Sequence, residues 1–223
     1  LHDALPILKF DTIPERTKGG GAGLTEPFGQ KVMVFLDYAN INRSARDKNI
    51  EIDYSHFLDY ITGGRFLLDA FAYFPVDPRA EHATDFDKQK LWKAGYHVNE
   101  KVGTIAGESY KCNFDIEMTM DMLKAVYHAR PDVIVLASGD GDFIPLVYEL
   151  RKMGIRTEVA AFPVSASKDI ALKCSGFIDL DIYYSEYLDF VDGSIDVSEY
   201  PPEDDTDSED EADVSEEEKI NEE

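Results

Sequence analysis

The sequence lacks the features of a disulfide-bonded, zinc-stabilised or membrane-spanning protein. It contains only two cysteines, Cys112 and Cys174, without a Cys-x-x-Cys pair, so neither a disulfide framework nor a structural zinc site is expected. No stretch approaches the roughly 18 to 20 consecutive apolar residues of a membrane span, and no basic and then apolar leader opens the chain. We therefore expect a soluble, cytoplasmic protein with no membrane partner, in which both cysteines are reduced.

Basic residues are also scarce. The chain has 22 Lys and Arg residues against 45 Asp and Glu residues, a formal net charge of −23. Residues 196–223 contain fifteen acidic residues and only Lys219 as a base, which leaves −9 for the rest of the chain. Because such a block has little apolar surface to bury, residues 191–223 are predicted to form a disordered acidic tail. The tail could act in solubility alone, or it could recruit a basic protein partner or compete with nucleic acid for a basic site.

The rest of the chain has the composition of one folded domain with a lead-in. Apolar residues make up 43% of the sequence and aromatic residues 12%, which is enough for a core. Residues 1–30 contain three prolines and the run GGGAG, so they are predicted to be a flexible N-terminal segment. The domain is expected to span residues 31–190.

Short apolar runs alternate with helix-compatible segments along this domain. Strands are predicted at residues 31–36, 65–74, 96–102, 133–137, 155–162 and 177–181. Helices are predicted at residues 53–62, 79–93, 114–127, 142–153 and 165–174, with a loop or short edge element at 103–113. Residues 182–188 are expected to be a final docking helix or an interface. The alternation predicts an α/β fold, a three-layer α/β/α domain with a mainly parallel sheet.

The predicted helix at residues 114–127 has the clearest periodicity in the chain. Its residues Ile116, Met120, Leu123 and Tyr127 fall at i, i+4, i+7 and i+11, the pattern of an apolar face that packs on a core. Asn113 is a natural cap for this helix. Asp115 lies in its first turn, where the helix dipole favours a carboxylate.

Carboxylates gather at one edge of the predicted sheet. Asp37 follows the first strand, and Asp140 and Asp142 follow the strand at 133–137 in the sequence SGDGD. Parallel strands end at a common edge, and Asp115 begins a helix antiparallel to the adjacent strand, so all four acids are expected at that edge. Their mutual repulsion would be relieved by a hard divalent cation, which predicts a Mg²⁺ or Mn²⁺ site and phosphodiester chemistry.

A structural interpretation of the Asp-Gly-Asp turn is an alternative. Asp140 could cap the turn and Asp142 could cap the helix that follows it. Convergence with Asp37 and Asp115 favours the metal site, and Asp140, nearest the strand end, is the firmer ligand. Asp121 lies about 120° around its helix from Asp115 and is not expected in the same site.

Three segments of the sequence resemble a known family. They are Asp37-Tyr38-Ala39-Asn40, Lys111 followed by DIEMTMD at residues 115–121, and SGDGDFIP at residues 138–145. Together they resemble the NYN domain of the LabA-like group, which is similar in fold to the Rossmann-like PIN and FLAP nucleases. The resemblance implies a metal-dependent ribonuclease that acts on RNA, with Mg²⁺ or Mn²⁺ as cofactor.

The resemblance also implies roles for particular residues. Its metal-binding and catalytic acids correspond to Asp37, Asp115, Asp140 and Asp142, with Asn40 in support. Lys111 could contact a substrate phosphate, although a solvated lysine is an equal alternative. Ser138 is expected either at the substrate or, with Asn40, as a donor that fixes the carboxylates.

Other functions remain open from the sequence. The charge of −9 outside the tail favours a regulatory protein that binds RNA or protein without cleaving it, because most nucleic-acid binders have a positive surface. Six basic residues could nevertheless line a cleft: Arg79, Lys88, Lys90, Lys93, Lys101 and Lys111. A phosphatase with an aspartyl nucleophile fits less well, because no second Asp lies two residues after Asp37. The chain could also form a homo-oligomer.

Overall fold

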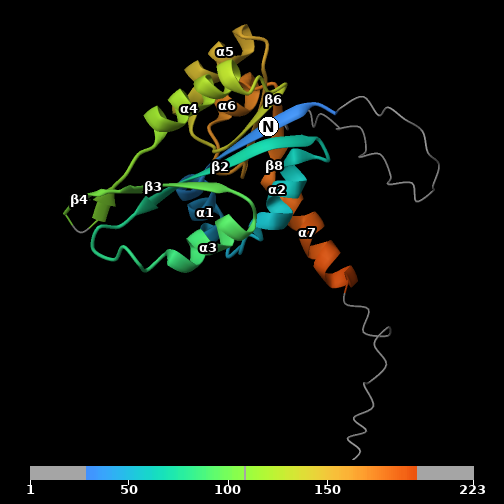
Figure 1. Ribbon diagram of the computed structural model, residues 1–223. Coiled ribbons are helices and arrows are strands. Elements are labelled where there is room, and N and C mark those ends of the chain that lie inside the picture. The colour runs from blue at the N-terminus through green and yellow to red at the C-terminus, as the bar shows by residue number, and fades with distance from the viewer. Residues whose placement is uncertain (1–28, 108, 195–223) are drawn as a thin grey trace, which may run out of the picture.

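A six-stranded sheet with helices on both faces forms the body of the protein (Figure 1). The computed structural model describes residues 29–107 and 109–194, and the structural statements below concern this part of the chain. The sheet has the order β3-β2-β1-β6-β7-β8, and each neighbouring pair is parallel. The predicted flexible segment and acidic tail lie, over residues 1–28 and 195–223, outside the described residues.

The elements follow one another along the chain with strands and helices largely alternating. The sheet strands are β1 (Lys31–Asp37), β2 (Phe66–Val76), β3 (His97–Val102), β6 (Val133–Ala137), β7 (Arg156–Ala161) and β8 (Gly176–Asp179). A separate antiparallel hairpin is formed by β4 (Thr104–Ala106) and β5 (Ser109–Lys111). The helices are α1 (Tyr38–Asp47), α2 (Tyr54–Thr62), α3 (Asp85–Lys93), α4 (Asp115–His128), the 3₁₀ helix η1 (Gly141–Phe143), α5 (Ile144–Lys152), α6 (Lys168–Lys173) and α7 (Leu180–Ser194).

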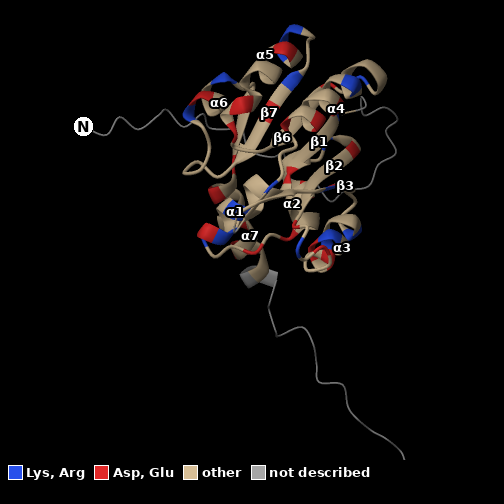
Figure 2. Ribbon diagram, turned by 90° about the vertical axis from the view of Figure 1, so that its left-hand side faces the viewer, with Lys and Arg blue, Asp and Glu red and all other residues tan. Residues whose placement is uncertain are grey.

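Two hydrophobic clusters fill the two spaces between the sheet and its helices. Helices α1, α2, α3 and α7 contribute to one cluster, and α4, α5 and α6 contribute to the other. The side chains of β1 alternate between them, since Val34 belongs to the first cluster and Phe35 to the second. Figures 1 and 2 show the two groups of helices on opposite sides of the sheet. The predicted three-layer α/β/α architecture is confirmed.

Helix α1 was not expected from the sequence. It has only a short apolar pattern, because Tyr38, Ile41 and Ala45 are its buried apolar residues within an otherwise polar segment. These residues fall at i, i+3 and i+7, which is a helical spacing, and Asp37 caps the helix, so the sequence did carry a signal for α1, but one made of only three apolar residues.

Helix α4 packs through a different face from the one that its sequence predicted. Met118 and Met122 are fully buried, whereas Ile116, Met120 and Tyr127 are 71%, 52% and 69% exposed. The helix has two apolar stripes, and periodicity alone could not decide which of them faces the sheet. Asp115 lies three positions before Met118 and so on the same face of the helix, which means that the stripe that packs also turns Asp115 towards the sheet.

Helix α7 docks on the domain, which resolves the alternative left open for residues 182–188. Tyr183 is 1% exposed, and its ring contacts Phe57 at 5.5 Å and Tyr60 at 4.9 Å between centroids. None of the helices in the described ranges is long and apolar enough to cross a membrane.

Candidate metal centre

Asp37 links the end of β1 to the beginning of α1. As the cap of α1, its carboxylate accepts a hydrogen bond from the backbone nitrogen of Asn40 at 3.1 Å. The hydroxyl of Ser138, which follows β6, donates to the other carboxylate oxygen at 3.2 Å. Two neighbouring strands and a helix therefore fix the position of this carboxylate.

Asn40 and Ser138 connect Asp37 to the turn that contains Asp140. The side-chain oxygen of Asn40 accepts from the backbone nitrogen of Gly139 at 3.0 Å, and the oxygen of Ser138 accepts from that of Asp140 at 3.3 Å. Ser138 is completely buried, so it has no surface to offer a substrate. Its burial and its hydrogen bonds to Asp37 and to the Asp140 nitrogen favour the predicted support of a carboxylate over the predicted substrate contact, and both roles stay predictions.

Three carboxylates converge beside this network. Asp115, Asp140 and Asp142 each offer an oxygen, and these atoms all lie within 4.8 Å of one another. Asp140 also accepts from the backbone nitrogen of Asp142 at 2.9 Å, and Asn113 donates to Asp115 at 2.7 Å. The side chain of Asp142 does not cap α5, which begins after Phe143 without a side-chain cap. Asp140 thus caps the turn, as the structural interpretation expected, whereas Asp142 does not cap the helix that follows.

The turn that carries Asp140 and Asp142 is closely packed at the glycines on both sides of Asp140, most tightly at Gly139, where the neighbouring atom is backbone. A Cβ atom at Gly139 would lie 2.9 Å from the Cα atom of Ala166, and one at Gly141 would lie 2.9 Å from the hydroxyl of Ser167. The segment after β7 thus lies directly against the turn, and its Ser167 nitrogen donates to the Gly139 carbonyl at 2.8 Å. Sequence reasoning missed this support, and the small residues at 165–167 are its only sequence signal.

The electrostatics of the site disfavour a full set of negative charges. Burial raises the pKa of Asp37 above its usual 3.8, and the charges of Asp115 and Asp140 raise it further, against the hydrogen bonds from Asn40 and Ser138. The atoms that these four residues could offer to a metal ion are carboxylate oxygens, with no thiolate or imidazole among them. Such a set fits a hard divalent cation such as Mg²⁺ or Mn²⁺.

Replacing Asp37 with Asn is expected to stabilise the metal-free protein at neutral pH. Because the folded pKa is raised, the folded state holds this proton more tightly, and stability falls as the pH rises from 3.8 through the folded pKa. The variant lacks this penalty, so its advantage should be present at neutral pH and disappear below about pH 3.8. Urea denaturation in EDTA at several pH values measures it; an unchanged or lower stability at neutral pH would contradict the electrostatic account.

Most of the basic residues that could have lined a cleft are neutralised. Ion pairs join Arg79 to Asp77, Lys88 to Asp85 and Glu100, Lys90 to Glu51, and Lys101 to Glu117. Lys93 and Lys111 are exposed and form no ion pair with another described residue. Lys111 therefore remains available for the predicted phosphate contact.

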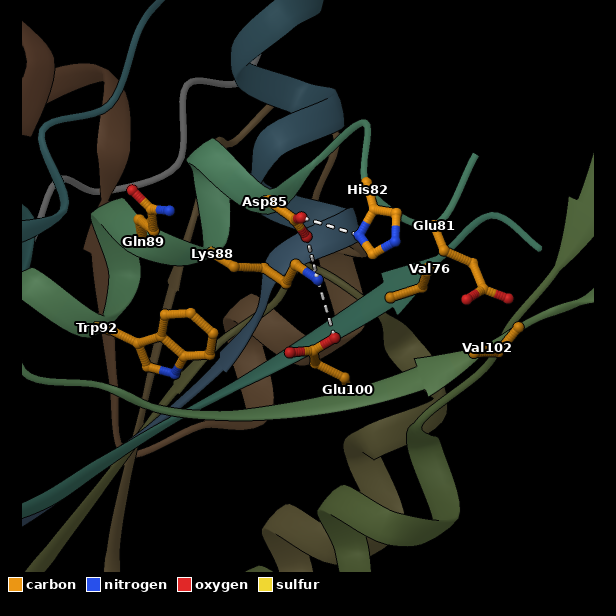
Figure 3. A pocket seen from close by; sticks show the side chains of 9 residues that line it. All are labelled: Val76, Glu81, His82, Asp85, Lys88, Gln89, Trp92, Glu100 and Val102. Carbon is orange, nitrogen blue, oxygen red and sulfur yellow. Dashed lines mark hydrogen bonds and ion pairs between the residues drawn. The ribbon is translucent and has the colours of Figure 1, made fainter. Parts of the chain in front are cut away.

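A pocket between α3 and β3 is distinct from the carboxylate cluster (Figure 3). Lys88 crosses it and bridges Asp85 at 2.7 Å and Glu100 at 3.0 Å, while Trp92 lies at one side. None of the four carboxylates of the candidate centre lines it. This pocket is therefore not the place where the proposed chemistry would occur.

The parallel sheet and its acidic edge define the chain as a nuclease-like α/β domain of the PIN type. The NYN domain family matches residues 31–181, and the chain belongs to this family. Domains of the family have a PIN-like nuclease fold, are generally nucleases and act on RNA.

A solved structure with the same fold is a protein of unknown function from Vibrio parahaemolyticus RIMD 2210633. It is 21% identical, and the match covers 72% of this chain and 99% of that one with a TM-score of 0.62. At this identity the likeness concerns the fold alone. A comparison with curated proteins gave no match.

Proposed function

We propose that this NYN domain, as a member of the LabA-like group, is a divalent-metal-dependent endoribonuclease. The observation that carries the proposal is the convergence of Asp115, Asp140 and Asp142 within 4.8 Å at the carboxyl edge of a parallel sheet, next to Asp37. Clusters of this kind in a nuclease-type fold are suited to phosphodiester hydrolysis.

The four carboxylates have separable roles in this proposal. Asp115, Asp140 and Asp142 would bind Mg²⁺ or Mn²⁺ directly. Asp37, which is more buried, would add its negative charge beside them. Asn40 and Ser138 orient Asp37 and the turn at Asp140 through the hydrogen bonds described above. When bound, the divalent ion supplies activation of water and stabilisation of charge on the phosphate.

The proposed substrate is RNA whose backbone approaches the acidic edge from the side of the β4–β5 hairpin. Lys111 ends β5 and offers an exposed ammonium group to a phosphate oxygen. The expected cytoplasmic location and a basic partner for the acidic tail stay predictions.

Purified protein is expected to cleave single-stranded RNA internally when Mn²⁺ or Mg²⁺ is present and not when EDTA is present. Because the ion neutralises the repelling carboxylates, Mn²⁺ should also raise thermal stability, by about 2.7 kcal/mol at a concentration of 100 times Kd. Gel analysis of end-labelled RNA and thermal unfolding with and without Mn²⁺ test both effects. Equal cleavage in EDTA would reject the metal mechanism, and stabilisation without cleavage would reject the nuclease.

A protein that binds RNA without cleaving it is the second candidate. The ion pairs of Arg79, Lys88, Lys90 and Lys101 favour it, because they leave little free positive charge to attract a polyanion to the site. Stabilisation by Mn²⁺ together with RNA binding and no cleavage products is the combination of results that would select this candidate.

A further inference from the structure

The β4–β5 hairpin begins at the same edge of the sheet as the carboxylates. It follows β3, and the backbone nitrogen of Gly103 donates to the carbonyl of Val76 at 2.9 Å, which fixes the base of the hairpin to the end of β2. In the sheet, β2 separates β3 from β1, whose end carries Asp37. Two strand spacings of about 4.8 Å therefore place the hairpin base about 10 Å from the strand of Asp37 along this edge.

Tyr110 and Ile105 form an apolar platform on one face of this hairpin. The two residues are directly opposite one another in the pair of strands, so their side chains lie on the same face. Ile105 is 58% exposed, and Tyr110 is partly exposed. The ring of Tyr110 lies over Gly103, where a Cβ atom would be 2.5 Å from the ring atom Cδ2. Glycine at this position thus leaves room for the ring at the base of the hairpin.

Arg43 lies on α1 next to the residues that orient the candidate metal centre. It follows Asn40 by three positions, so the two share one face of the helix, and Asn40 bonds to the turn that contains Asp140. Helical side chains lean towards the N-terminus of their helix, which at α1 is the end capped by Asp37. Arg43 is exposed and forms no ion pair with another described residue. It therefore offers positive charge beside the carboxylates.

Arg43 is also close to Tyr110. Burial and the negative charge of Asp77 raise the pKa of the Tyr110 hydroxyl, whereas the charges of Arg43 and Arg79 lower it. Aromatic rings stack unpaired bases, and arginine side chains bind backbone phosphates, so a ring beside a guanidinium group suits single-stranded nucleic acid. The 10 Å between the hairpin base and the strand of Asp37 corresponds to about three stacked nucleotides at 3.4 Å each.

We propose that Tyr110 and Arg43 position single-stranded RNA at the metal centre, with a base stacked on the ring of Tyr110 and a phosphate bound by Arg43. The inference rests on the proposed function, because it assigns substrate contacts of the same site. A base within a double helix is already paired and stacked on its neighbours, so the RNA that fits is a single strand or a loop. Both residues act by positioning the substrate and not in the reaction at phosphorus.

Two substitutions of Tyr110 test the stacking contact. Phe and Leu both keep an apolar side chain over Gly103, but only Phe keeps a ring. Tyr110→Phe should bind a labelled oligouridylate within about twofold of the wild type, and Tyr110→Leu at least about fivefold more weakly. Fluorescence anisotropy in EDTA measures binding without cleavage. Equal binding by the two variants, or an equal loss by Tyr110→Leu for an oligomer that lacks bases, would overturn the stacking contact.

Arg43→Gln tests the phosphate contact through its salt dependence. It should weaken binding and reduce the slope of log K against log salt concentration by about 0.7, the contribution of one phosphate on a single strand. Arg130→Gln is the matched control, because Arg130 is exposed and its carbonyl accepts from Lys31 at the opposite edge of the sheet. The control should keep the wild-type slope. A wild-type slope in Arg43→Gln would remove Arg43 from the proposal.

Cleavage in Mn²⁺ separates this inference from the proposed function. Tyr110→Leu and Arg43→Gln should raise KM and leave kcat within a few-fold, because they remove binding that is equal in the ground and transition states. A wild type that cleaves RNA, with KM unchanged in both variants, would overturn the inference and leave the nuclease standing. RNA binding that depends on both residues, without cleavage by the wild type, would support the inference and reject the nuclease. Circular dichroism checks that each variant is folded.

Discussion

Asp140→Asn is expected to reduce the rate of Mn²⁺-dependent RNA cleavage at least about 100-fold while leaving the fold intact. Loss of a group that merely supports a metal ligand typically costs 10- to 100-fold, so loss of a ligand charge in the centre of the cluster should cost more. The amide oxygen of Asn can still accept the 2.9 Å hydrogen bond from the backbone nitrogen of residue 142, so the turn should persist. Single-turnover cleavage of end-labelled RNA measures the effect.

Asp121→Asn is the matched control for this prediction. Asp121 lies on α4, like Asp115, but its carboxylate bonds to the hydroxyl of Tyr73 and to Lys124 and is not part of the cluster. This control should retain cleavage within a few-fold. Equal losses in both variants would indicate a general effect of charge, and wild-type cleavage by Asp140→Asn would remove Asp140 from the mechanism.

The common edge of the carboxylates could be predicted from the sequence because that prediction depends only on the topology of the sheet. Parallel strands point in the same direction, so residues that follow β1 and β6 must lie at one edge whatever their exact contacts. The pairing of these two strands and the convergence of Asp115, Asp140 and Asp142 agree with that reasoning. The roles of these residues in catalysis stay predictions.

The details of the site depend on contacts between segments far apart in sequence, which local patterns do not report. Gly139 is needed because the backbone of Ala166, which follows β7, lies against the turn. The burial of Ser138, which favours a supporting role over a substrate contact, also depends on the packing of the whole domain. Likewise, the ion pair of Lys101 with Glu117 joins residues of β3 and α4. It could not be read from the sequence, so the prediction counted Lys101 among the basic residues free to line a cleft.

Helix α4 shows the same limit in its packing. Met118, Met122 and Ala125 form a stripe with the same period as Ile116, Met120 and Leu123, so both faces satisfied the rule for a packed helix. Only one orientation also directs Asp115 to the carboxylates after β6. The position of Asp115, combined with periodicity, would have selected the observed face.

Tyr183→Ala is expected to lower the free energy of unfolding by about 3 to 5 kcal/mol, the usual cost of removing a large aromatic side chain from a core. Tyr183 is 1% exposed and lies between α7 and α2, where it contacts the rings of Phe57 and Tyr60. The cavity should release α7 from the sheet face that α1, α2 and α3 share with it. Urea denaturation followed by tryptophan fluorescence and circular dichroism measures the loss.

Two control variants separate packing from other causes of that loss. Tyr183→Phe keeps the ring and removes only a hydroxyl whose hydrogen bond to the Asp53 carbonyl is long, 3.4 Å, so it should cost no more than about 1 kcal/mol. Tyr148→Ala on α5, where the side chain is 41% exposed, should stay within about 0.5 kcal/mol of the wild type. If Tyr183→Ala were as mild as Tyr148→Ala, α7 would not be part of the cooperative core. The sheet face opposite α4 would then be stabilised by the packing of α1, α2 and α3 alone.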